Sequence, residues 1–205
     1  MNDSHINLIG NCCVSAFIYE LNNIQFNNPF IWSFINPQSY KNIILNYNSI
    51  PTSKISLSEV SNNDRTYYRV RISPDIDIDY IHYIYSPNHS TPVSDGRNVL
   101  YRYAYKYTVD KYIKRLNRMI TSRILPSFLI LDGLPECDYQ LNDLLAIISI
   151  IGKYKLCIIS KYSELLTYNS NHIKIIYDNH PRNNNGWYTE QYARHYNNEI
   201  MKFLL

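Results

Sequence analysis

A short turn near the start of the chain, Gly10-Asn11-Cys12, carries the first group that could do chemistry. The apolar run Ile6–Ile9 precedes it and a helical pattern follows, which predicts a strand, a tight turn and a helix. A cysteine at the positive end of a helix favours the thiolate, and the amides of such a turn can bind an anion or an oxyanion. Cys12 is therefore a candidate nucleophile, with Gly10 and Asn11 as candidate ligand-binding residues. The alternative is that Cys12 is only a small residue tolerated in a tight turn.

A histidine late in an alternating segment is the candidate partner of this cysteine. His82 lies in Asp75–Tyr85, where apolar and polar residues alternate as in a strand. If this strand ends at the carboxyl edge of the sheet, His82 can serve as a general base. The alternative is a buried histidine packed between Tyr80 and Ile84. No partner spacing singles out the other histidines, which are His5, His89, His172, His180 and His195.

Two further polar residues stand where predicted strands end. Asp132 follows the apolar run Ser127–Leu131, and Ser160 follows Lys155–Ile159. The carboxyl ends of parallel strands form the usual ligand crevice of an open α/β sheet. We therefore expect Asp132 and Ser160 to line the same crevice, with Asp132 as a candidate ligand-binding residue. The alternative for Asp132 is a role in forming the turn with Gly133.

One segment of the chain is strongly basic. From Arg97 to Arg123 the net charge is +7. Because the whole chain has a net charge of +3, the remaining residues have a net charge of −4. The periodicity predicts a helix from about Ala104 to Ile120 whose Lys/Arg face includes Arg115 and Arg118. These two arginines are candidate contacts for the phosphates of a small ligand. The alternative is a basic face that is merely solvated.

The succession of strands and helices predicts a single three-layer, Rossmann-like α/β domain over residues 1–205, with a mostly parallel sheet. We expect Ile6–Ile9, Phe128–Leu131 and Cys157–Ile159 to be adjacent, parallel strands. Asn36-Pro37 is a helix-start signal, because asparagine caps a helix and proline suits its first turn. Asp138 is a candidate cap for the helix that runs to Ile151.

Composition narrows the classes of function. The chain has 205 residues, 45% of them hydrophobic and 18% charged, which is typical of a globular protein. Its longest apolar run and its N-terminus fit neither a membrane span nor a signal peptide, so we expect a cytoplasmic protein. The four cysteines lack zinc-ligand spacing, so no metal is expected. The modest basicity and the acidic cluster Asp75, Asp77 and Asp79 disfavour nucleic acid as a partner.

Several segments together resemble two families, the domains of unknown function 1919 and 1796, which occur in capsule and exopolysaccharide gene clusters. The second of these carries the label of a papain-like cysteine peptidase. The segments that carry the resemblance are Gly10-Asn11-Cys12 with its helix, Asn28–Trp32, an aromatic near Tyr40, Ile81–Tyr83, Tyr112–Arg118, Phe128–Asp132 and Gly186-Trp187. The Gly-Asn-Cys turn is also similar to that of some capsule acetyltransferases, which bind coenzyme A.

The resemblance implies a role in building surface glycans, with Cys12 and His82 as the reactive pair and Arg115 and Arg118 as anion contacts. The expected function is acyl transfer, most simply acetyl transfer, from a coenzyme A thioester to a sugar. His82 would deprotonate the acceptor, and the arginines would bind the phosphates of acetyl-CoA. The alternatives are a hydrolase with Cys12 as nucleophile, a nucleotide-sugar glycosyltransferase, and a non-catalytic glycan- or nucleotide-binding domain.

Overall fold

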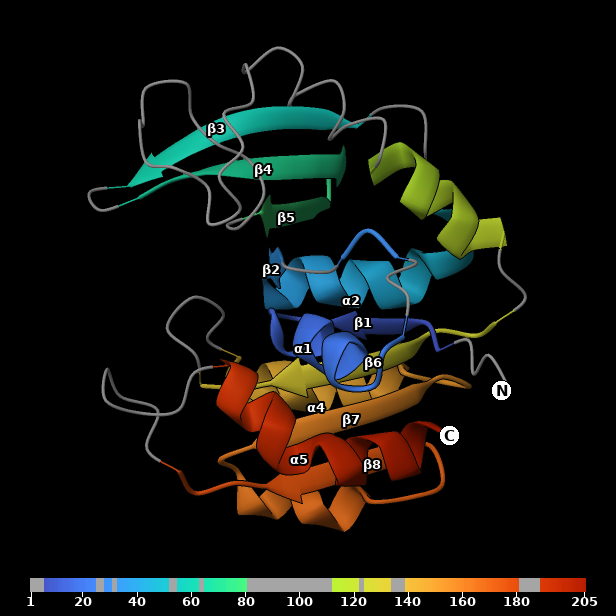
Figure 1. Cartoon of the computed structure of the whole chain (residues 1–205), viewed down its shortest axis with the longest axis vertical. Helices are drawn as coiled ribbons and strands as arrows, with labels where there is room; N and C mark the ends of the chain where they lie inside the picture. The colour runs from blue at the N-terminus through green and yellow to red at the C-terminus, as the bar shows by residue number, and fades with distance from the viewer. Residues whose placement is uncertain are drawn as a thin grey trace.

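Two four-stranded sheets follow one another along the long axis of the computed structural model in Figure 1. The structure describes residues 6–24, 28–30, 33–51, 55–62, 65–80, 112–121, 124–133, 139–180 and 189–205. The first sheet is parallel and consists, in spatial order, of β1 (Leu8–Gly10), β6 (Ser127–Leu131), β7 (Lys155–Ser160) and β8 (Ile173–Tyr177). The prediction of adjacent, parallel strands at Ile6–Ile9, Phe128–Leu131 and Cys157–Ile159 is confirmed.

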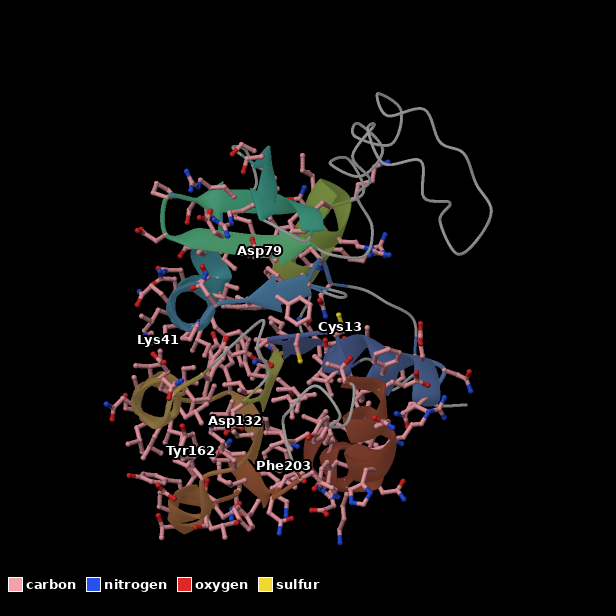
Figure 2. The ribbon with its side chains drawn as sticks, turned by 90° about the vertical axis from the view of Figure 1, so that its left-hand side faces the viewer. Cys13, Lys41, Asp79, Asp132, Tyr162 and Phe203 are labelled. Carbon is pink, nitrogen blue, oxygen red and sulfur yellow. The ribbon has the colours of Figure 1, made fainter. Side chains whose placement is uncertain are left out.

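Helices cover both faces of this parallel sheet. Figure 2 shows α1 (Val14–Leu21) and α5 (Thr189–Leu204) on one side, and α2 (Pro37–Asn46) and α4 (Leu141–Ile150) on the other. Because both faces are covered, the central strands are continuous apolar runs, and every residue of Phe128–Leu131 is fully buried. The three-layer, Rossmann-like α/β prediction is confirmed. None of the helices among the described residues has the length and apolar character needed to cross a bilayer.

The second sheet is antiparallel, and the sequence did not predict it as a separate sheet. Its spatial order is β2 (Ser33–Ile35), β5 (Ile76–Tyr80), β4 (Arg65–Ser73) and β3 (Ser56–Asn62). The strands β4 and β5 are joined by a two-residue turn, a connection that permits only antiparallel pairing. The structure therefore adds a second sheet to the predicted parallel one, and half of the described strands lie in it.

The antiparallel sheet has one apolar and one charged face. Val70, Ile72, Ile76 and Ile78 are buried. On the alternate positions, Arg69 pairs with Asp79 at 2.7 Å and Arg71 with Asp77 at 2.8 Å. The hydrogen bond from Arg71 lowers the pKa of Asp77 below its usual value. The aspartates of the predicted acidic cluster that lie on β5 are thus neutralised by cross-strand arginines.

The outer edge of β8 is closed by the segment that precedes it. The backbone N–H groups of Ile175 and Ile173 donate to Asn169 Oδ1 at 2.7 Å and to Ser170 Oγ at 3.1 Å. The N–H of Ser170 donates to the carbonyl of Ile173 at 2.8 Å. Asn169 and Ser170 follow the 3-10 helix η2 (Ser163–Tyr168), so this corner supplies the partners that a further strand would otherwise supply.

The helix starts follow capping chemistry. The Asn36 side chain accepts from the Ser39 N–H at 2.9 Å, with Pro37 in the first turn of α2, as predicted. The N-cap of α4 is Gln140, which forms a capping box with Asp143. Asp138, the predicted cap of α4, lies outside the described residues. Of the basic helix predicted from about Ala104 to Ile120, the described residues from 112 onward are helical, and the helix continues to residue 121.

Candidate functional site

The carboxyl edge of the parallel sheet, at which its strands end, collects polar side chains from all four strands. Asn11 follows β1, Asp132 follows β6 and Ser160 ends β7. Asp178 and His180 follow β8. Figure 2 looks onto this edge, where Asp132 and Tyr162 are labelled. Open α/β sheets bind their ligands at this edge, so we take it as the candidate functional site.

An aspartate–histidine pair lies at the end of β8. The side chain of Asp178 is completely buried, and its Oδ1 is in close contact with Nδ1 of His180. The side chain of His180 is 35% exposed, so the ring joins a buried carboxylate to solvent. Of the two tautomers of a neutral imidazole, a carboxylate at Nδ1 favours the one with its proton on Nδ1, and the lone pair then lies on Nε2. This is the arrangement of a general base held by an orienting carboxylate.

A second polar cluster consists of Ser160, at the end of the neighbouring strand β7, and Asp132, after β6. Ser160 Oγ donates to Asp132 Oδ2, and both residues are fully buried. Ser160 Oγ also accepts from the N–H of Tyr162 at 3.0 Å, and the Lys161 N–H donates to Asp132 at 3.2 Å. Asp132 and Ser160 therefore lie together at the predicted edge, but both are fully buried below its surface, so they do not line an open crevice there. Their hydrogen bonds fix the start of the segment after β7. In this segment Lys161 is exposed, and its Nζ lies 5.1 Å from the centroid of the Tyr162 ring.

The two clusters share a rigid backbone frame. The N–H of Asp178 donates to the carbonyl of Ser160 at 2.8 Å, and the N–H of Asp132 donates to the carbonyl of Ile159 at 3.1 Å. Each hydrogen bond extends the pairing of neighbouring strands by one residue beyond the strand ends. The ladder therefore fixes the order of Asp132, Ser160 and Asp178 along the carboxyl edge.

Asn11 joins the two sheets and the parallel ladder. Its N–H donates to the Leu129 carbonyl of β6 at 3.1 Å, but its carbonyl accepts from the N–H of Ile35 in β2 at 2.9 Å and is therefore not used for pairing with β6. The side chain takes over the pairing with β6: Nδ2 donates to the Leu131 carbonyl at 3.0 Å, and Oδ1 accepts from the Leu131 N–H at 2.9 Å. The predicted ligand-binding residue thus has a structural role that the sequence did not indicate.

Gly10 has a packing role in the same turn. A Cβ atom at this position would stand 2.6 Å from Ser15 Oγ and 2.7 Å from Ser15 Cβ. Contacts this short do not occur between real side chains, so only glycine lets the first turn of α1 approach β1 this closely.

Cys12 lies at the carboxyl edge but is inaccessible. It has no exposed surface, and Cys13 and Cys157 are also buried. A nucleophile must reach its substrate, and Cys12 cannot do so in this conformation. The structure thus brings Gly10, Asn11, Cys12 and Asp132 to one edge, with Cys12 below its surface.

Burial gives a testable expectation for the thiols. Iodoacetamide at neutral pH should modify Cys12 in the native protein as slowly as it modifies Cys157, whose pKa burial raises to about 12. The measurement is mass spectrometry of the alkylated peptides with and without urea, which should expose both thiols equally. Rapid native alkylation of Cys12 alone would restore it as a candidate nucleophile.

The basic helix belongs to the opposite edge of the sheet. Over residues 112–121 it is held by Met119, whose carbonyl accepts from the Tyr47 hydroxyl at 3.1 Å. That hydroxyl also accepts from Asn7 Nδ2 at 2.7 Å, and Asn7 directly precedes β1. Arg115 is half-buried and Arg118 is exposed on this helix. The structure therefore does not bring the two arginines together with Cys12 and Asp132.

The predicted base, His82, lies outside the described residues. The strand that precedes it, β5, ends at Tyr80 and belongs to the antiparallel sheet, where Tyr80 pairs with Ser33. The expectation that this strand ends at the carboxyl edge of the parallel sheet has no support, because β5 is not part of that sheet.

Asp178 and His180 are functional candidates that the sequence reasoning missed. The signal is local, because His172–Tyr177 contains three isoleucines in the manner of a buried strand and Asp178-Asn179-His180 follows it directly. The rule that selected Asp132 and Ser160, polar residues after predicted parallel strands, also selects this pair.

Comparison with known proteins supports part of the resemblance. Residues 1–90 match the model of the family described as "Domain of unknown function (DUF1919)". The expected resemblance to this family is therefore confirmed for the N-terminal 90 residues. The matched part includes Cys12 and His82, whereas Asp132, Ser160 and the Asp178–His180 pair lie beyond it. No curated protein matches the chain.

Proposed function

We propose that the chain is a transferase that activates a sugar hydroxyl at the carboxyl edge of its parallel sheet, with His180 as the general base. The observation that carries the proposal is the pairing of His180 Nδ1 with the buried Asp178 at the end of β8. The transferred group is an acyl group, most simply acetyl. The sugar acceptor and the role in surface-glycan assembly come from the resemblance to the domain of unknown function 1919.

In the proposed reaction, the chain must remove one proton from the acceptor hydroxyl. His180 Nε2 takes the proton of the acceptor hydroxyl as the oxygen forms its bond to the acyl carbon. Asp178 stabilises the resulting imidazolium without itself taking the proton. His180 then returns the proton to the leaving thiolate, so the base is restored and the overall exchange is one ester for one thioester.

Acetyl-CoA, the expected donor, would supply an acetyl group already activated as a thioester. The described residues fit the hydroxyl-activating half of this reaction. Arg115 and Arg118, the expected phosphate contacts, do not fit it, because their helix is anchored at the edge where β1 begins. Lys161 is a positive charge at the carboxyl edge itself, held beside Asp132 by its own N–H. We therefore assign the attraction of the donor's phosphates to Lys161.

The test is release of free thiol from acetyl-CoA in the presence of a panel of sugars and nucleotide-sugars, with mass spectrometry of the products. Acetylated sugar should form with the wild-type chain, and Lys161→Gln should raise the KM for acetyl-CoA with little change in kcat. Binding of donor or sugar without any product would favour the non-catalytic binding domain. Sugar transfer from a nucleotide-sugar would favour the glycosyltransferase.

A further inference from the structure

The closing helix α5 passes beside the Asp178–His180 pair and contacts it twice. The Tyr196 hydroxyl donates to Asp178 Oδ1 at 2.7 Å. The ring of His195 packs edge-on against the ring of Tyr196 at 4.6 Å and against that of His180 at 5.8 Å between centroids. Both contacts come from adjacent residues on one helix.

The contact with Asp178 is made at the same oxygen that faces the histidine. Oδ1 of Asp178 lies against Nδ1 of His180 and also accepts from the His180 N–H at 3.4 Å. Tyr196 is 7% exposed and Asp178 is 1% exposed, so the hydrogen bond between these two residues is screened from solvent. In such surroundings a hydrogen bond to a carboxylate is stronger than in water, and its loss is correspondingly costly.

We infer that Tyr196 is a positioning residue of the site, whose hydroxyl fixes the Asp178 carboxylate and through it the imidazole of His180. This inference rests on the proposed function of His180 as the base. In this role the hydroxyl only donates a hydrogen bond to Asp178, and the inference requires no proton transfer through it. Its effect is geometric: the carboxylate cannot rotate about its last bond without breaking the hydrogen bond from Tyr196.

The helix itself is well anchored, which makes this role possible. α5 packs on α1, and Asn22 Nδ2 at the end of α1 donates to Asn197 Oδ1 at 2.7 Å. At its C-terminal end, Lys155 Nζ donates to the carbonyls of Phe203 and Leu204 at 2.8 and 3.0 Å. A side chain on a helix held at these points can fix a carboxylate at the end of a strand.

The experiment compares Tyr196→Phe with Tyr192→Phe in the full chain. Tyr192 is buried one turn earlier on α5, so its variant controls for the loss of a buried hydroxyl from this helix. Tyr196→Phe should lower kcat for acetyl transfer about tenfold with KM unchanged, which is the size of effect expected for a lost hydrogen bond to a charged group. Tyr192→Phe should leave kcat within about twofold of the wild type.

A spectroscopic readout tests the inference independently of activity. A histidine N–H bound to a carboxylate gives a strongly deshielded proton signal in nuclear magnetic resonance, assigned here by its absence in His180→Gln. Tyr196→Phe should shift this signal or remove it through faster exchange with water, while Tyr192→Phe retains it. An unchanged signal in Tyr196→Phe overturns the inference. If the wild type transfers no acetyl group, the proposed function fails, and this signal still decides the role of Tyr196.

Discussion

Replacing His180 with glutamine is expected to lower the rate of acetyl transfer by about 100- to 10,000-fold, the usual contribution of a positioned general base. Glutamine keeps the size and polarity of the side chain but has no basic nitrogen. The acceptor hydroxyl would then have to lose its proton without help. The measurement is kcat/KM from the release of thiol, with the unfolding transition followed in parallel to show that the variant is folded.

The matched control for this variant is His172→Gln. His172 immediately precedes β8, at the opposite end of the strand, and its side chain is exposed. It should retain wild-type activity. Asp178→Asn should also lose activity, because an amide cannot stabilise the imidazolium as a carboxylate does. Full activity in His180→Gln would remove His180 from the mechanism and return attention to His82.

Replacing Asn11 with alanine is expected to destabilise the fold by about 2 to 6 kcal/mol. The change leaves the N–H and the carbonyl of Leu131 buried without their present partner, and each unsatisfied group costs about 1–3 kcal/mol. Asn11 is fully buried, so water cannot replace the lost amide without opening the turn. The measurement is urea unfolding at equilibrium, extrapolated to zero denaturant.

Asn42→Ala is the control for this substitution. Asn42 Nδ2 also donates to a backbone carbonyl, that of Asp75 at 2.7 Å, but at an exposed position. Water can replace that bond, so the free energy of unfolding should change by less than about 1 kcal/mol. Equal losses for Asn11→Ala and Asn42→Ala would show that Asn11 does not hold β1 to β6.

The parallel sheet could be predicted because each of its strands is read from local residues alone. Phe128–Leu131 and Leu156–Ile159 are unbroken apolar runs, as strands covered on both faces must be. The start of α2 could also be predicted from local residues, since Asn36 supplies the cap and Pro37 the first turn. Once these strands are taken as parallel, their carboxyl ends lie at one edge of the sheet, which places Asp132 and Ser160 near each other.

What could not be predicted depends on pairing between distant segments. The alternation in Asp75–Tyr85 indicates a strand but does not say which strand it pairs with, so the sequence could not tell that β5 belongs to the antiparallel sheet. The role of Asn11 depends on Ile35 and Leu131, and no spacing in the sequence connects them. The location of Arg115 and Arg118 is likewise set by the contact between Met119 and Tyr47. Periodicity identifies the buried face of a helix but not the edge of the sheet at which the helix lies.

The closed edge of β8 bears on the tendency of the chain to associate with other copies or chains. An exposed edge strand offers a row of unpaired amides on which another chain can build, which is a common start of aggregation. Here Asn169 and Ser170 occupy the outward amides of Ile175 and Ile173, so an incoming strand would first have to displace them. Two short polar side chains thus hinder the addition of another chain at the β8 edge of this isoleucine-rich sheet.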